Sequence, residues 1–169
     1  MIRRWPRAWA REASPRWTAS IFRYFGTKDR IVIWDEADEG QVARLLGEIA
    51  AGSLAVALER FAALLDAADN DARRNALARK SLISREQALA GQAALNAARF
   101  GALIADALAA RSRRRSPTFA ERAVGRAAAG LMSAAIEEWS RRGGRVKLAR
   151  LVAEAVEAMK AAHDEGADA

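Results

Sequence analysis

Apolar side chains recur at helical spacing through much of this 169-residue chain. Between residues 41 and 51, and again between 54 and 67, they return every three or four positions, which places them on one face of a helix. Gly52 and Ser53 either end the first helix and cap the second, or bend one continuous helix. The apolar positions are Val42, Leu45, Leu46, Ile49, Leu54, Leu58, Phe61, Leu64 and Leu65. Both segments are therefore expected to face a core.

The second half of the chain predicts four more helices. Their expected ranges are about 71–82, 84–111, 117–142 and 145–162. Ser84 is the expected N-cap of the long second helix, whose apolar positions are Leu89, Leu95, Phe100, Leu103, Ile104 and Leu108. Ser116 and Pro117 supply an N-cap and a first helical residue for the third. The predicted fold class is all-α.

The last two predicted helices are joined at Gly143 and Gly144, so they should form an antiparallel hairpin. Many residues of the 117–142 helix are small, which permits close approach of another helix. That helix belongs either to the same subunit or to a symmetry mate. The apolar positions of the last helix are Val146, Leu148, Leu151, Val152, Val156 and Met159. Gly91 and Gly101 lie inside the 84–111 helix, where close packing or a nearby ligand would explain the missing side chain.

A further helix is predicted over residues 15–25, because Ser14-Pro15 is a favourable start and Gly26 a favourable stop. Thr27 can then cap a following helix and place Lys28 in its first turn. The helix dipole disfavours a cation there, so Lys28 either meets an anion or is solvated. Residues 31–33 are β-branched, but no partner strand is evident, and helix is the preferred interpretation.

Positive charge is concentrated at the start of the chain. Residues 1–30 carry eight basic and two acidic side chains, a net +6 of the total +7. Such a patch suits nucleic acid, an acidic membrane surface or a disordered basic tail. A second basic run, Arg113 to Arg115, lies between two predicted helices and either contacts nucleic acid or is solvated.

The residue types argue against several functional classes. The chain has no cysteine, and its single histidine, His163, lies in a polar stretch without other metal ligands. We find no nucleophile beside a base and no glycine-rich phosphate loop, so we predict no enzyme, no metal site and no cofactor. No run approaches the 18 apolar residues that span a membrane, and we expect a cytoplasmic protein.

The residues from Ser20 to Asp29, which read Ser-Ile-Phe-Arg-Tyr-Phe-Gly-Thr-Lys-Asp, resemble the end of the recognition helix of the tetracycline-repressor (TetR) family of transcriptional regulators. Residues 31–38 are similar to the helix that follows this motif in many members. The resemblance implies an all-helical homodimer, paired through about residues 117–162, that binds operator DNA and releases it when a small molecule binds the second domain. It implies a DNA-binding region at 1–39 and a regulatory and dimerisation domain at 40–169.

Functional residues follow from the same resemblance, position by position. Those near DNA bases or phosphates would be Thr18, Ala19, Ser20, Phe22, Arg23, Tyr24 and Lys28. Arg23 is the strongest candidate, because a bidentate arginine can read guanine. The effector pocket should be mostly apolar. Its predicted wall is Trp34, Phe61, Leu65, Phe100, Leu103, Met132 and Trp139, each of which could instead be plain core.

The start of the chain departs from the family pattern. Two further helices should precede the motif, and Arg16-Trp17 stands where the usual turn has a small residue and Val-Ser. We therefore interpret the DNA-binding unit as incomplete. The alternative function is a helical dimerisation or small-molecule-binding module that has lost DNA binding. The sequence leaves the effector and the operator open.

Overall fold

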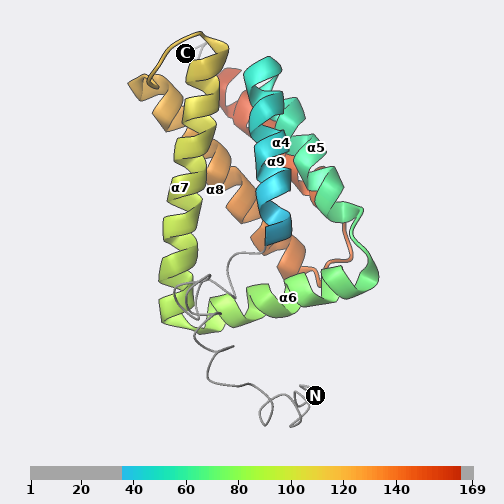
Figure 1. Ribbon diagram of the computed structural model, residues 1–169. Helices are drawn as coiled ribbons and strands as arrows, with labels where there is room; N and C mark the ends of the chain where they lie inside the picture. The colour runs from blue at the N-terminus through green and yellow to red at the C-terminus, as the bar shows by residue number, and fades with distance from the viewer. Residues whose placement is uncertain (1–35, 165–169) are drawn as a thin grey trace, which may run out of the picture. The chain divides into compact units, whose positions relative to one another are not determined.

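The computed structural model describes residues 36–164, with side chains from 42 to 161, and Figure 1 shows this part of the chain. Its regular elements are all α-helices, which confirms the predicted fold class. They are α4 (Glu36–Ala51), α5 (Leu54–Asp66), α6 (Asn70–Arg85), α7 (Gln87–Arg111), α8 (Phe119–Arg141) and α9 (Leu148–Asp164). The chain breaks at Gly52 and Ser53, so α4 and α5 are separate helices.

Two predicted N-caps were wrong. Ser84 lies in the last turn of α6, where its Oγ donates to the carbonyl of Ser81, and the N-cap of α7 is Glu86. The N-cap of α8 is Thr118, not Ser116. Thr118 Oγ1 accepts from the N–H of Glu121 at 3.3 Å, and Glu121 Oε2 accepts from the N–H of Thr118 at 2.8 Å. This reciprocal pair satisfies two N–H groups that would otherwise lack partners, so it sets the helix start.

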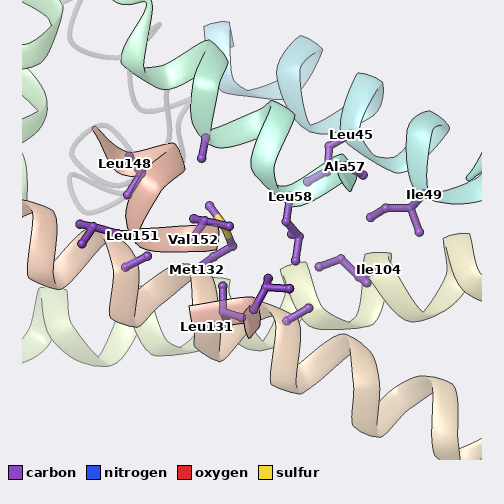
Figure 2. Packing of buried hydrophobic residues seen from close by; sticks show 14 of the residues in the cluster. Leu45, Ile49, Ala57, Leu58, Ile104, Leu131, Met132, Leu148, Leu151 and Val152 are labelled. Atoms are coloured by element: carbon purple, nitrogen blue, oxygen red, sulfur yellow. The ribbon is translucent and has the colours of Figure 1, made fainter. Parts of the chain in front are cut away.

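A single apolar core joins five of the helices, and Figure 2 shows part of it. α4 contributes Leu45 and Ile49, and α5 contributes Leu58. The remaining core residues are alanines, branched aliphatic residues and one methionine: Ala57, Ala62, Ile104, Ala107, Leu108, Ala128, Leu131, Met132, Ala135, Leu148, Leu151, Val152 and Val156. Many are alanines, so the helices approach closely and leave little room between them.

The helix α6 differs from its neighbours because none of its residues is buried. It packs against α7 and α8 along one side (Figure 1). A helix with so little buried apolar surface depends on contacts at its ends for its position.

α7 and α8 cross at a pair of glycines. A Cβ on Gly125 would lie 2.2 Å from the carbonyl oxygen of Gly101, and one on Gly101 would lie 3.1 Å from that of Gly125. Backbone meets backbone here, and close packing explains Gly101. Gly91 has nothing within 4 Å of a Cβ in the described part of the chain, so its role differs.

Several long apolar side chains that periodicity placed in the core are exposed. Leu64 is 37% exposed, Leu95 57%, Leu103 40% and Met159 52%. On α7 the buried face is formed largely by small residues beside Ile104 and Leu108, because close crossing with α8 requires them. The leucines are thereby left on the outer side.

α7 is also long and apolar enough to cross a membrane by the criteria of length and composition, which the sequence analysis did not expect. α7 packs against α4, α6 and α8. It also carries Arg99 and Asp106 on its exposed side. We therefore interpret α7 as a helix of the bundle whose outer face is partly uncovered.

Candidate functional site

The predicted DNA-contacting residues lie outside the described residues. They are Thr18, Ala19, Ser20, Phe22, Arg23, Tyr24 and Lys28. Trp34, from the predicted effector pocket, also lies outside them. Their roles remain predictions.

Two aromatic residues of the predicted pocket meet inside the bundle. The ring centroids of Phe61 on α5 and Phe100 on α7 are 6.4 Å apart, and the rings are tilted by 34°. Both side chains are half-buried and pack against the core, as does Leu65 at the end of α5. A tilted aromatic pair at this distance is a favourable contact in its own right.

The other predicted wall residues lie in three different environments. Met132 is 2% exposed and belongs to the core. Trp139 is half-buried, and its Cζ2 atom lies 3.2 Å from where a Cβ on Gly144 would stand. Leu103 is on the outer side of α7. The fold thus brings Phe61 and Phe100 together but leaves Leu103 exposed.

Two open grooves lie along α4 and α5, and both are lined by Glu48 and Arg60. None of the six predicted wall residues that the structure describes lines either groove. In the interior, by contrast, the described residues include no buried polar or charged side chain. A ligand held in this interior would be recognised through apolar contacts.

The outer face of α8 is lined by small residues. Ala123, Ala127, Gly130 and Ala134 are exposed, and a Cβ added to Gly130 would have no described atom within 4 Å. The opposite face of α8, with Gly125, is buried against α7. Both faces of α8 therefore carry small side chains, but only the face that packs against α7 is covered by other described residues.

A carboxylate that sequence reasoning missed links α5 to α9. Asp66 Oδ1 accepts from the N–H of Leu148 at 2.8 Å, and Oδ2 accepts from the N–H of Ala149 at 2.9 Å. The negative charge of Asp66 is unfavourable at the C-terminus of its own helix, α5, because the helix dipole is negative there. The same charge is favourable at the N-terminus of α9, where the dipole is positive. Asp66 lies at the end of the predicted 54–67 helix, and no role was predicted for it. An aspartate placed unfavourably at the end of an apolar helix was the available signal.

The same corner fixes one end of α6. Arg73 Nη2 donates to the carbonyl of Asp66 at 3.2 Å. A Cβ on Gly144 would lie 3.2 Å from Leu77 Cδ1 and 3.5 Å from Arg73 Cδ. The start of α6, the end of α5 and the turn between α8 and α9 thus form one junction, which we name the Asp66 junction after its central carboxylate.

Comparison with known proteins identifies the domain. The family model of the MftR C-terminal domain, a C-terminal domain of TetR-family regulators, matches residues 53–164, which is 112 of the 169 residues. This range contains α5 to α9, and with them most of the core, the hairpin and the Asp66 junction. No curated protein and no solved structure matches the chain significantly. The chain belongs to the TetR family of transcriptional regulators, and the helices from α5 to α9 are its C-terminal domain.

Proposed function

We propose that this protein is a transcriptional repressor of the cytoplasm that binds operator DNA as a homodimer and is released by a small apolar effector. Family membership supports the general assignment. The observation that carries the proposal is the outer face of α8, where small residues leave a helix surface uncovered in a domain of a family whose C-terminal domains generally dimerise.

In the proposed dimer, the hairpin of α8 and α9 pairs with the same hairpin of a second subunit. Two antiparallel hairpins related by a twofold axis form a four-helix bundle, and small residues allow the central helices to approach closely. Gly130 lies near the middle of the uncovered face, between Ala127 and Ala134. It would lie close to the twofold axis.

The effector would enter the interior of the domain near Phe61 and Phe100. The absence of buried polar groups among the described residues favours an apolar molecule. Release of DNA requires that the effector bind one dimer geometry more tightly than the other, because equal affinity would shift no equilibrium.

Dimerisation is tested by Gly130→Gln, with Gly47→Gln as its matched control. Both glycines are exposed within helices, and a Cβ on either has no described atom within 4 Å. Glutamine favours a helix more than glycine does, so each change should stabilise its helix by up to about 1 kcal/mol, and neither should unfold the subunit. In sedimentation experiments only Gly130→Gln should shift the protein from dimer to monomer. Equal dissociation of both variants, or of neither, would contradict the proposed interface.

DNA binding is tested by titrating the chain into labelled duplex DNA from the region upstream of its own gene, at several salt concentrations. A form extended by two helices that complete the helix-turn-helix is titrated in parallel. Specific binding should weaken steeply with salt, because each phosphate contact releases counterions. Binding by the extended form alone would show that the 169-residue chain has lost DNA binding, which is the alternative function. Failure of both forms would refute the repressor proposal.

A further inference from the structure

The connection between α7 and α8 carries an unusual concentration of arginine. Residues 111–122 contain five arginines and one glutamate, a net charge of +4. All five arginines are exposed. We refer to Arg113, Arg115, Phe119 and Arg122 as the α8 entry surface. The proposed repressor function makes no use of it.

Three of the five arginines are engaged in holding the connection together. Arg111 Nη1 donates to the carbonyl of Gly52 at 2.8 Å, and Arg114 forms an ion pair with Glu121. Arg122 Nη1 donates to the carbonyl of Pro117 at 2.7 Å. The only nearby carboxylate in this segment is therefore already neutralised by Arg114.

The other two arginines have no partner among the residues that the structure describes. Arg113 and Arg115 make no hydrogen bond or ion pair through their side chains to any residue that the structure describes. Solvated loop arginines alone would be unremarkable. Arg113, however, stands at a backbone position that disfavours any side chain with a Cβ.

Arg113 has a φ of 56°, in the left-handed region. Its N–H donates to the carbonyl of Ala110 and that of Arg114 to Ala109, both at 2.9 Å, which is the hydrogen-bond pattern that ends helices at a glycine. A non-glycine residue there costs about 1 kcal/mol. An arginine at this position adds charge to the surface at a cost in stability.

Phe119 gives this surface an exposed aromatic ring. Its side chain is 78% exposed, the largest fraction among the large hydrophobic residues that the structure describes. Phe119 and Arg122 are separated by three residues and therefore lie on the same side of α8. Phe119 thus lies on the same side of α8 as Arg122 and four residues after Arg115.

We propose that the α8 entry surface binds single-stranded nucleic acid. Arginine suits phosphate groups because its planar guanidinium can donate two parallel hydrogen bonds. An exposed ring within a positively charged surface provides a stacking platform for an unpaired base. Duplex DNA would use the arginines but offer no free base to Phe119, and an acidic protein would offer no base at all.

The first test removes the two unpartnered charges in the full-length chain. The probe is a fluorescent oligothymidylate of about 12 nucleotides, a length within the range of single-strand sites. The variant Arg113→Gly/Arg115→Gln should bind it about tenfold more weakly, and the slope of log affinity against log salt should fall by about 1.4, or 0.7 for each lost phosphate contact. Arg113→Gly relieves the left-handed strain, so weaker binding would not reflect unfolding.

The matched control is Arg85→Gln/Arg145→Gln, which removes the same charge from two exposed arginines of other helix ends. The basic residues 1–30 could also bind the oligothymidylate, and this control measures how much a loss of two positive charges elsewhere weakens such binding. We expect less than about a threefold change and an unaltered slope. Equal losses in the two double variants would refute a specific surface at the start of α8.

The second test concerns stacking. Phe119→Leu should weaken binding of the oligothymidylate by about fivefold or more, Phe119→Tyr should preserve it, and neither should alter binding of a duplex of the same length. Sedimentation of each variant is measured alongside. If Phe119→Leu changes the association state and leaves strand binding intact, the ring belongs to a subunit interface and the proposal fails. Unchanged strand binding with an unchanged association state refutes it equally.

Discussion

The connections at the two ends of α8 begin with the same backbone arrangement. After α7, the N–H groups of Arg113 and Arg114 donate to the carbonyls of Ala110 and Ala109 at 2.9 Å. After α8, those of Gly143 and Gly144 donate to Ser140 and Trp139, also at 2.9 Å. In each case the first of the two residues has a φ near 60°. Both helices therefore end in the same hydrogen-bonded motif.

Their surroundings are opposite. Gly143, which corresponds to Arg113, is exposed, but the next residue, Gly144, is buried in the Asp66 junction, whereas Arg113 and Arg114 are both exposed among other arginines. At the first site the lack of a side chain permits packing, and at the second a side chain is present despite its conformational cost. The same hydrogen-bonded motif thus serves a packed corner in one place and a charged surface in the other, because the neighbouring elements differ.

The largest expected effect comes from Gly144→Ala. Its φ of 68° disfavours alanine, and the new Cβ would lie 3.2 Å from both Leu77 Cδ1 and Trp139 Cζ2. The free energy of unfolding should fall by about 2 to 3 kcal/mol, from left-handed strain and crowding together. Urea denaturation at a fixed protein concentration measures this.

Gly143→Ala is the matched control. Gly143 has a φ of 63°, but a Cβ there has no described atom within 4 Å. Its cost should be limited to the strain, about 1 kcal/mol. Equal costs at the two glycines would show that packing in the Asp66 junction contributes little.

The second effect comes from Asp66→Ala. It removes the acceptor of two N–H groups at the start of α9 and leaves them without a protein partner. We expect a loss of about 2 kcal/mol in the free energy of unfolding, as for helix-capping residues. Asp66→Asn keeps one acceptor oxygen and should cost about half as much. Hydrogen exchange should quicken first in the first turn of α9, and an unchanged rate there would contradict the capping role.

The third effect is a gain. Arg113→Gly should raise the free energy of unfolding by about 1 kcal/mol, because glycine adopts a φ of 56° without strain. The same urea titration measures it, with Arg115→Gln as a control that should change stability little. A destabilised Arg113→Gly variant would mean that the arginine side chain supports the turn.

The smallest effect is a pH dependence at the start of α8. The N–H of Thr118, and then Arg114 and the Thr118 hydroxyl, lower the pKa of Glu121 below its usual 4.5. A lowered pKa in the folded state means that this contribution to stability is present above the ordinary value and lost as pH falls through the folded pKa. Amide exchange in the first turn of α8 should therefore gain protection from below pH 4.5 towards neutrality. Glu121→Gln should remove that dependence.

The existence and order of the described helices could be predicted from apolar spacing together with cap and turn residues. Helix starts were less predictable, because Ser84 and Ser116 are acceptable caps by residue type. Glu86 and the Thr118–Glu121 pair occupy those positions instead. Of the predicted wall residues, Phe61 and Phe100 are half-buried and pack against the core, whereas Leu103 is exposed. Apolar character does not specify which face of a helix a neighbour will cover.

The sequence by itself determined that these residues form an all-α domain, because helical periodicity and turn residues are local properties. It also carried the resemblance to the TetR family, which the match over residues 53–164 confirmed. Only the tertiary structure decided that Asp66 caps α9, that Gly101 faces Gly125, and that α8 keeps an uncovered small face. These features depend on contacts between residues up to 83 positions apart, and no local pattern specifies such pairs.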